Sequence, residues 1–479
     1  MKENYDVLVV GAGTAGIYFA REMASKGYSV CVIDAMPAKK LGEKLPIFHC
    51  DSERFPVFGI PEPKPGDDEY IGMFESGTYY SPFSQYLKRN DGTECIKRAD
   101  YPFYALRLPE FIKRQIGQAE AAGAEFYYET PFSDLTFGAD GRINGAKVKF
   151  NGKEKTVSAR LVADCSGMNS VVRRKLPETA KVGTFDITDR EKFFVILRYV
   201  KFKNPEDYPK CAEHWAYWKS WIGLGTSDDL AIIGTGANLS YEYAETCYQR
   251  FAAAVQMPEH EVVKIEKGAT PYRPAPYSLV ADGFVCMGDS ACMTKWIGEG
   301  IASSWVGCKI LADTAGEAMK DGAYPTEEKL WEANVKYNTT QAANFAYIVA
   351  TLVNAIECTA EENEYQFQKE IVFSTKAMTR LNRTYSADLP VGEVFELIGK
   401  VIGGVVTKNI SMHSVKCLLR GILYAAKLKT HYRNFPKTPL GFEKWKAKAD
   451  ALWKATGSMA EVTEKIEAML IEKEKETAK

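Results

Sequence analysis

Asp6-Val-Leu-Val-Val10 leads directly into Gly11-Ala-Gly-Thr-Ala-Gly16, and this stretch decides the fold of the chain. The apolar run predicts a buried strand, and the G-x-G-x-x-G pattern predicts a tight turn into a helix over residues 17–26. A second apolar run over residues 28–33 ends in Asp34. Strand, glycine turn, helix, strand and acid in this order are typical of a βαβ unit that binds a dinucleotide.

Each residue of the glycine turn has its own expected role. Gly11 permits the tight turn, Gly13 lets a pyrophosphate approach the backbone, and Gly16 lets the helix pack closely on the strand. Ala15 lies between them and is expected beside the cofactor. The helix N-terminus offers free N–H groups and a positive dipole end, and the Asp34 carboxylate can accept hydrogen bonds from a ribose. The alternative is a purely structural turn, and the pattern alone does not separate FAD from NAD.

The composition of the chain argues against several classes of protein. The 479 residues allow two or three domains, and a net charge of −1 argues against a general nucleic-acid binder. The 11 cysteines form no C-x-x-C pair and the five histidines lie far apart, so no metal site is expected. Unpatterned cysteines fit the reducing cytoplasm, and no stretch approaches the ~20 apolar residues of a membrane span.

Two further blocks lie far along the chain. Residues 161–167 (Leu-Val-Ala-Asp-Cys-Ser-Gly) predict a buried strand that ends in Asp164 and a glycine turn. Residues 283–289 predict a strand that ends in Gly288-Asp289. A second glycine turn, Gly298-Glu-Gly300-Ile301, then precedes a long helix from about Ala302 to Lys320.

These blocks together resemble the FAD fold shared by aromatic hydroxylases, flavin halogenases and geranylgeranyl reductases, over about residues 1–320. The resemblance implies FAD as the cofactor, with Asp289 accepting a hydrogen bond from the ribitol chain. It implies that the N–H groups of Gly298, Gly300 and Ile301 face the flavin O2 edge, where a positive dipole end stabilises a reduced, anionic flavin. Arg107 is another expected cofactor contact, because it falls where the family often has an arginine. Lys44 and Asp164 are also expected to contact the cofactor. The alternative role of Lys44 is that of a solvated surface lysine, and the alternative role of Asp164 is that of a helix cap.

The resemblance implies an α/β (α+β overall) architecture in three parts. The first is a discontinuous, Rossmann-like three-layer FAD-binding domain over residues 1–50, 96–180 and 270–325. The second is an inserted β-sheet domain for the substrate, over residues 51–95 and 181–269. The third is a C-terminal helical region over residues 326–479.

The motifs of the chain point to two different subfamilies of this fold. Tyr217-Trp-Lys-Ser-Trp-Ile-Gly223, followed by Gly234-Thr-Gly236, is similar to the geranylgeranyl reductase pattern but lacks its Phe-Pro. Gly42-Glu-Lys-Leu-Pro46 and Ala291-Cys292 are similar to flavin halogenases. In the flavin loop, Trp296 replaces the usual proline.

The favoured hypothesis is a flavin reductase that transfers hydride from flavin N5 to a carbon–carbon double bond of an apolar or isoprenoid-like substrate. Tyr217 and Cys50 are the guesses for a proton donor. An aromatic substrate wall is expected from Trp215, Tyr217, Trp218, Trp221 and Trp296, whose alternative is ordinary sheet packing. Two other functions stay open: an oxygen-using hydroxylase or halogenase that acts on an aromatic substrate, and a non-catalytic FAD-binding sensor.

The expected partners follow from these hypotheses. No second dinucleotide motif with strand and helix context is present, so the electron donor is external: NAD(P)H, ferredoxin or free reduced flavin. Residues 408–433 predict a basic amphipathic helix that can lie on an anionic membrane surface. The alternative is a helix packed on the catalytic domain, with a solvated basic face. A cytoplasmic protein is expected, with membrane-surface association as an option.

Overall fold

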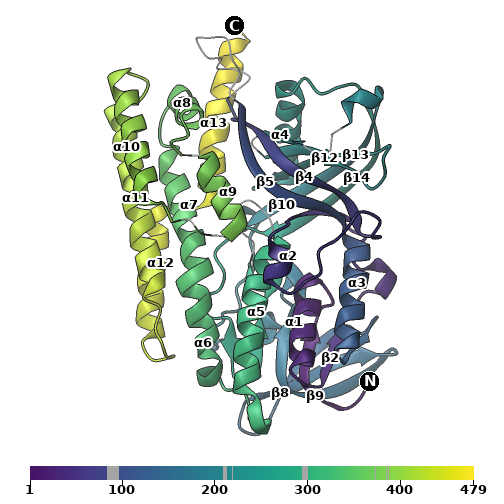
Figure 1. The fold of residues 1–479 in the computed structure, drawn as a ribbon. Coiled ribbons are helices and arrows are strands. Elements are labelled where there is room, and N and C mark those ends of the chain that lie inside the picture. Colours follow the sequence, from purple (N-terminus) through teal and green to yellow (C-terminus); the bar gives the residue numbers. More distant parts are fainter. Residues whose placement is uncertain are drawn as a thin grey trace.

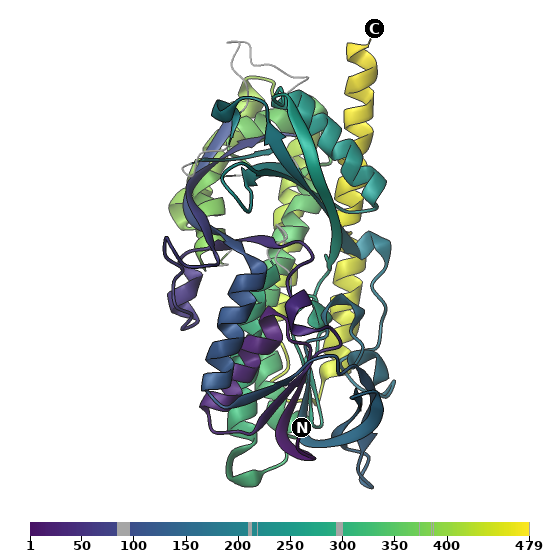
Figure 2. The ribbon, with the colours of Figure 1, turned by 90° about the vertical axis from the view of Figure 1, so that its right-hand side faces the viewer.

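Two eight-stranded sheets and a group of C-terminal helices make up the fold (Figure 1). The computed structural model describes residues 1–83, 96–208, 213–217, 219–293, 300–372, 374–384, 386 and 388–478. The first sheet and its helices form one end of the molecule, the second sheet forms the other, and the C-terminal helices run along both (Figures 1 and 2).

The first sheet is mainly parallel and carries the N-terminal glycine turn. Its strands run in the order β15-β16-β9-β1-β2-β6, and β7 and β8 extend β9 as an antiparallel ribbon. The strand bounds are β1 (Asn4–Val10), β2 (Val30–Ile33), β6 (Ala124–Tyr127), β7 (Phe132–Phe137), β8 (Ile143–Phe150), β9 (Lys153–Asp164), β15 (Val280–Ala281) and β16 (Phe284–Cys286). The near-continuous apolar runs of β1 and β2 are buried, as parallel strands between covering layers require.

Three helices pack together beside this sheet. They are α1 (Thr14–Ser25), α3 (Leu108–Ala121) and α5 (Gly300–Ala318), and α1 lies against both of the others. Trp305 of α5 is fully buried and contacts the rings of Tyr18, Phe55 and Phe111. The largest hydrophobic core of the protein therefore lies under the glycine turn and holds it in place.

The second sheet is mixed, and one of its faces is covered by a helix. Its strands run in the order β14-β10-β13-β12-β11-β4-β5-β3. Their bounds are β3 (Ile47–Asp51), β4 (Tyr70–Tyr80), β5 (Ile96–Arg107), β10 (Lys192–Phe202), β11 (Glu213–Tyr217), β12 (Ser220–Leu224), β13 (Ala231–Ala237) and β14 (His260–Pro271). Helix α4 (Tyr241–Ala254) packs on alternate residues of the sheet, such as Ile196, Val200 and Ile233.

Two strands of the second sheet come from segments that the sequence assigns to the FAD-binding domain. Residues 47–50 lie in β3 and residues 96–107 in β5, and these strands pair with each other. The chain therefore enters the second sheet before residue 51 and leaves it after residue 107, whereas the predicted domain limits lie at residues 50 and 96. Which strands pair depends on the tertiary structure, and the local sequence pattern does not show it.

The helical C-terminal region is confirmed. Its helices are α6 (Glu327–Tyr337), α7 (Ala343–Ala355), α8 (Ala360–Gln368), α9 (Thr375–Thr384), α10 (Val391–Val406), α11 (Met412–Arg433), α12 (Phe442–Thr456) and α13 (Met459–Thr477). Helix α13 joins the second sheet's helix α4, because Arg250 pairs with Glu467 and Glu474 of α13 (Figure 2). Across the described parts of the chain, no helix is both long and apolar enough to span a bilayer.

Candidate cofactor site

The glycine turn has the geometry that its sequence predicts. A Cβ on Gly11, whose φ is +109°, would overlap the Cys165 carbonyl, and a Cβ on Gly16 would overlap the Gly11 carbonyl oxygen. A Cβ on Gly13 would instead meet nothing within 4 Å. Two glycines thus serve close backbone packing, while the third leaves open space at the start of α1. No side chain caps this helix and its first turn holds no acid, so its N-terminus suits a pyrophosphate.

Asp34 holds the turn that it follows. Its Oδ2 accepts a hydrogen bond from the Ala12 N–H at 2.7 Å, and its Oδ1 accepts one from the Met36 N–H at 2.8 Å. Each carboxylate oxygen has a further lone pair, so a ribose contact is compatible with these bonds and stays a prediction.

At Gly288, the segment around residues 288–289 packs against the N-terminal glycine turn. The φ of Gly288 is +70°, and a Cβ placed on it would lie 2.8 Å from the Cβ of Ala15. The next residue, Asp289, is in a short 3₁₀ turn, where burial raises the pKa of its carboxyl to about 6 and a hydrogen bond with Thr270 partly opposes that shift. Thr270 lies in β14, so Asp289 joins the two sheets at the place predicted for the flavin.

Asp164 shapes the neighbouring loop. Its Oδ1 accepts from the Ser166 N–H at 3.0 Å, and its Oδ2 accepts from the Arg173 N–H at 2.7 Å. It is fully buried, and this burial raises the pKa of its carboxyl. The backbone-capping alternative is therefore observed, and a direct FAD contact stays a prediction.

Arg173 is a structural residue of this site that sequence reasoning missed. Its buried guanidinium donates to the carbonyl of Ser290 at 3.0 Å and to the carbonyls of Gly183 and Phe185 at 3.0 and 3.2 Å. It also lies 4.1 Å from the centre of the Phe185 ring. It ties the loop after Asp164 to the turn after Gly288. The basic pair Arg173-Arg174 was visible in the sequence, but nothing there marked which arginine turns inward.

Arg107 has partners other than the expected cofactor. Its Nη2 donates to the Thr226 carbonyl at 2.8 Å, and its Nη1 donates to the Tyr70 and Asp68 carbonyls at 2.7 and 3.0 Å. The observed role of this arginine is to join β4 to the turn after β12, and a contact with FAD stays a prediction. Lys44 is exposed on its loop, which agrees with the alternative that it is a solvated surface lysine.

The structure describes only some of the residues expected at the flavin end of the site. Gly300 and Ile301 form the first residues of α5, as expected. Gly298 and Trp296 lie outside the described residues, as does Trp218 of the expected substrate wall. Trp215 and Tyr217 are described by their backbone alone, in β11. Their side-chain roles stay predictions.

The sheet face opposite α4 is built from glycines with apolar side chains lying over them. Trp221 is paired with Gly234 across β12 and β13, and a Cβ on Gly234 would overlap the indole. Phe193 covers Gly236 in the same way, and Leu45 covers Gly268. Leu197, Tyr199 and Ile232 belong to the same apolar cluster as Leu45 and Trp221. We call this face, defined by Leu45, Phe193, Leu197, Tyr199, Trp221 and Ile232, the apolar wall.

Strand β3 brings two titratable side chains to this region. Cys50 is buried and belongs to the main core, with its Sγ 3.7 Å from the Asp51 carbonyl oxygen. His49 points to the other side, between the rings of Phe74 and Phe103, and burial lowers the pKa of its imidazole to about 4. His49 is therefore neutral at physiological pH. Its burial could not be foreseen, because the pairing of β3 was not foreseen.

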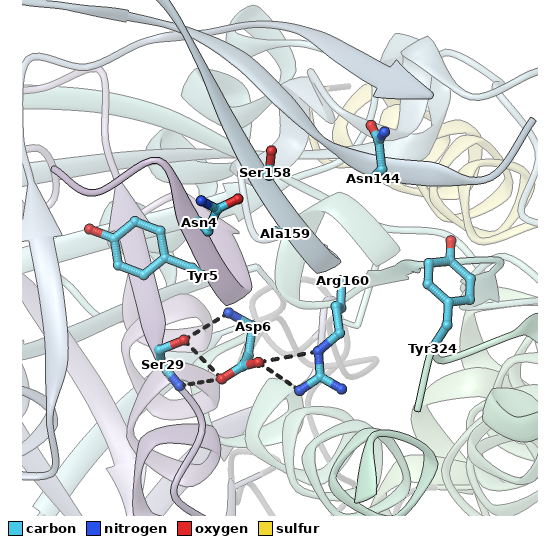
Figure 3. A pocket seen from close by; sticks show the side chains of 9 residues that line it. All are labelled: Asn4, Tyr5, Asp6, Ser29, Asn144, Ser158, Ala159, Arg160 and Tyr324. Carbon is cyan, nitrogen blue, oxygen red and sulfur yellow. Dashed lines mark hydrogen bonds and ion pairs between the residues drawn. The ribbon is translucent and has the colours of Figure 1, made fainter. Parts of the chain in front are cut away.

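A surface hollow of about 410 Å³ lies at the other end of the first sheet (Figure 3). It is lined by residues at the beginning of β1 and in the middle of β9, whereas ligands of such sheets bind beyond the carboxyl ends of the strands. Asp6 accepts hydrogen bonds there from Arg160 and Ser29, at 2.6 and 2.8 Å (Figure 3). These polar groups satisfy one another, so the hollow is not a second candidate for the cofactor.

Comparisons with known proteins agree with this geometry. Residues 6–42 match the FAD binding domain family. The chain is 24% identical over 472 residues to the digeranylgeranylglycerophospholipid reductase of Sulfolobus acidocaldarius, which covers 94% of this chain and 98% of that protein. It is 28% identical over 380 residues to the reductase of the same name from Haloferax volcanii, which covers 70% of this chain and 83% of that protein.

Solved structures show the same fold. A geranylgeranyl bacteriochlorophyll reductase-like protein from Thermoplasma acidophilum has a TM-score of 0.62 at 17% identity, covering 85% of this chain and 98% of its own. The flavin-dependent brominase Bmp2 has a TM-score of 0.57 at 16% identity, covering 83% and 94%. The fold and the FAD binding match together identify the cofactor of the glycine turn as FAD. The chain is an FAD-dependent oxidoreductase that resembles the geranylgeranyl reductases.

Proposed function

We propose that this protein uses FAD to reduce a carbon–carbon double bond in an apolar, isoprenoid-like chain. The observation that carries the proposal is the apolar wall, which the Thr270–Asp289 hydrogen bond joins to the predicted flavin position. The similarity to reductases of digeranylgeranylglycerophospholipid, over nearly the whole chain, supports the same substrate class.

Each part of the site has a separate task in this proposal. The bound FAD supplies the hydride that adds to the alkene. The uncapped start of α1 and the open space at Gly13 hold the pyrophosphate, and Asp289 holds the ribitol end. The apolar wall aligns the chain and excludes water, because Leu45, Phe193 and Trp221 lie over glycines and the wall is mostly apolar.

The wider organisation is also part of the proposal. The segments around the first sheet form the FAD-binding domain, the second sheet receives the substrate, and residues 326–479 form a C-terminal helical region. Electrons come from an external donor: NAD(P)H, ferredoxin or reduced flavin. Cys50 and Tyr217 remain the candidates for the proton donor.

An anaerobic half-reaction tests the proposal. The flavin is reduced by light without oxygen, and an alkene with isoprenoid units is then added. We expect the oxidised flavin spectrum to return, with a product two hydrogen atoms heavier by mass spectrometry. Phytane-type alkanes, which offer no double bond, are the matched control and should leave the flavin reduced.

The same experiment distinguishes the alternative. If every alkene leaves the flavin reduced, and air restores its spectrum while oxygen or halogen enters an aromatic substrate, the protein is an oxygen-using flavoenzyme and the reductase proposal is wrong. The brominase-like fold is compatible with that outcome but does not favour it, since the fold is shared by both classes.

A further inference from the structure

Helix α10 turns its apolar side toward solvent. Val391, Phe395, Ile402 and Val406 are between 58% and 76% exposed, and Ile398 is 48% exposed. Their spacing of three, four and seven positions places them on one face of the helix. Gly404 is the buried residue of this helix, where it lies against Ile410 and Tyr365.

Two acidic side chains of α10 pair with helix α9, and one of them, Glu393, is half-buried against it. Glu393 accepts two hydrogen bonds from Arg380 of α9, both at 2.8 Å, and Glu396 pairs with Lys376 of the same helix at 3.2 Å. An amphipathic helix on a water-soluble surface normally has the reverse orientation. The half-buried Arg380–Glu393 pair therefore holds the polar side of α10 on α9 and leaves its apolar face outward.

Helix α11 lies on the same flank of the molecule as α10 (Figure 1). Its inner side, which includes Cys417, Gly421 and Ala425, is buried, and the helix packs along α7. Its outer side exposes further large apolar side chains at helical spacing: Met412, Leu419, Ile422 and Leu423. We call the exposed apolar residues of α10 and α11 together the outer face.

Helix α11 and the turn before it carry charge of one sign. Residues 408–433 contain no Asp or Glu. Lys408, Lys416 and Lys427 are exposed and form no ion pair with any residue in the described part of the chain. On the helical wheel, Lys416 and Lys427 border the stripe of Leu419 and Leu423. An exposed apolar stripe with lysines along its edge is typical of a helix that lies in the headgroup region of a membrane.

We propose that the outer face docks on an anionic membrane surface, with α10 and α11 lying in its plane. The apolar side chains enter the boundary between headgroups and acyl chains, and the lysines meet the lipid phosphates. A second copy of the chain fits this face less well, because a symmetric contact would bring the unpaired lysines of both copies together. The inference does not depend on the proposed reaction, since binding is measured without turnover.

Vesicle flotation with the full-length holoprotein tests this. The probes are vesicles of phosphatidylcholine alone and of phosphatidylcholine with phosphatidylglycerol. We expect the protein to float with the anionic vesicles and to bind less at ~1 M salt, where the Debye length falls to about 3 Å. The double variant Phe395→Glu/Ile402→Glu should bind at least about tenfold more weakly, because two buried apolar side chains are lost.

A matched variant separates the outer face from exposed apolar residues in general. Val263 is half exposed on the edge strand β14, and Val263→Glu should float as the wild type does. The far-UV circular dichroism and FAD content of all variants show that each has folded. Wild-type protein that stays unbound at low salt would overturn the inference. So would a dimer in analytical ultracentrifugation that Phe395→Glu/Ile402→Glu converts to monomer, because the outer face would then be a self-interface.

Discussion

Ala15 and Gly288 lie against each other so closely that a Cβ on Gly288 would come within 2.8 Å of the Ala15 Cβ. The first residue belongs to the turn that begins α1, and the second precedes Asp289. Their contact brings together the two segments that we propose hold the pyrophosphate and the ribitol, although these segments are far apart in the sequence. It makes the absence of a side chain at Gly288 a requirement of the tertiary structure.

Gly288→Ala should therefore weaken both folding and FAD binding. The added methyl group meets Ala15, and the φ of +70° strains any residue with a Cβ. We expect the free energy of unfolding to fall by about 2–4 kcal/mol, from overpacking and strain together. Thermal unfolding and the FAD content of the purified protein measure the two effects.

Gly152→Ala is the control for backbone strain alone. Gly152 has a φ of +74°, and a Cβ there would meet nothing within 4 Å. This variant should lose only about 1 kcal/mol and keep its FAD. Equal losses in the two variants would show that contact with Ala15 plays no part.

Gly13→Ala and Gly16→Ala should separate binding from folding. A methyl group on Gly13 enters open space, so the apoprotein should keep its melting temperature while FAD affinity falls about tenfold or more, because the pyrophosphate is displaced. A methyl group on Gly16 meets the Gly11 carbonyl and should destabilise the apoprotein itself. Flavin fluorescence titration and thermal unfolding of the apoprotein give the comparison. An unchanged FAD affinity in Gly13→Ala would contradict the proposed pyrophosphate position.

Asp289→Ala should release FAD more readily than Asp289→Asn. The proposed contact is a hydrogen bond accepted from the ribitol chain, and asparagine keeps an acceptor oxygen that alanine lacks. Loss of one such bond should lower affinity by about 10-fold, while the asparagine variant stays closer to wild type. Equilibrium dialysis of FAD measures both variants, and equal affinities would argue against a hydrogen bond from the ribitol.

Trp221→Ala should impair substrate binding and spare the cofactor. The indole lies over Gly234 in the apolar wall, away from the glycine turn. We expect KM for an isoprenoid alkene to rise about tenfold with normal FAD content, because apolar contact area is lost. Trp221→Phe should recover most of this loss. A change in kcat alone, with KM unaltered, would mean that Trp221 does not contact the ground-state substrate.

His49 should make the protein sensitive to mild acid. Burial lowers the pKa of His49 from 6.5 to about 4. Between pH 6.5 and 4, the imidazole is therefore protonated in the unfolded chain and neutral in the folded chain. The free energy of unfolding therefore falls as pH drops from 6.5 toward 4, by up to about 3 kcal/mol from this group. Urea unfolding across that range should show a smaller loss for His49→Gln than for wild type. Parallel pH profiles would show that His49 is protonated equally in both states.

The sequence by itself determined the local parts of this protein. The order of strand, glycine turn, helix and acid around Gly11–Gly16 predicted the first βαβ unit, because turn chemistry and periodicity act over a few residues. The resemblance of that turn and Gly288-Asp289 to a known FAD fold gave the cofactor. The helical nature of residues 326–479 was also predicted from the sequence.

Only the tertiary structure decided how these parts meet. It placed residues 47–51 and 96–107 in the second sheet, turned Arg173 inward, gave Arg107 backbone carbonyls as partners, and set Trp221 over Gly234. It also turned the apolar side of α10 outward, an orientation that the sequence did not predict. Strand partners, buried charges and the direction of a helix face depend on contacts between residues far apart in the chain. Local propensity does not encode these contacts, whereas close packing decides them.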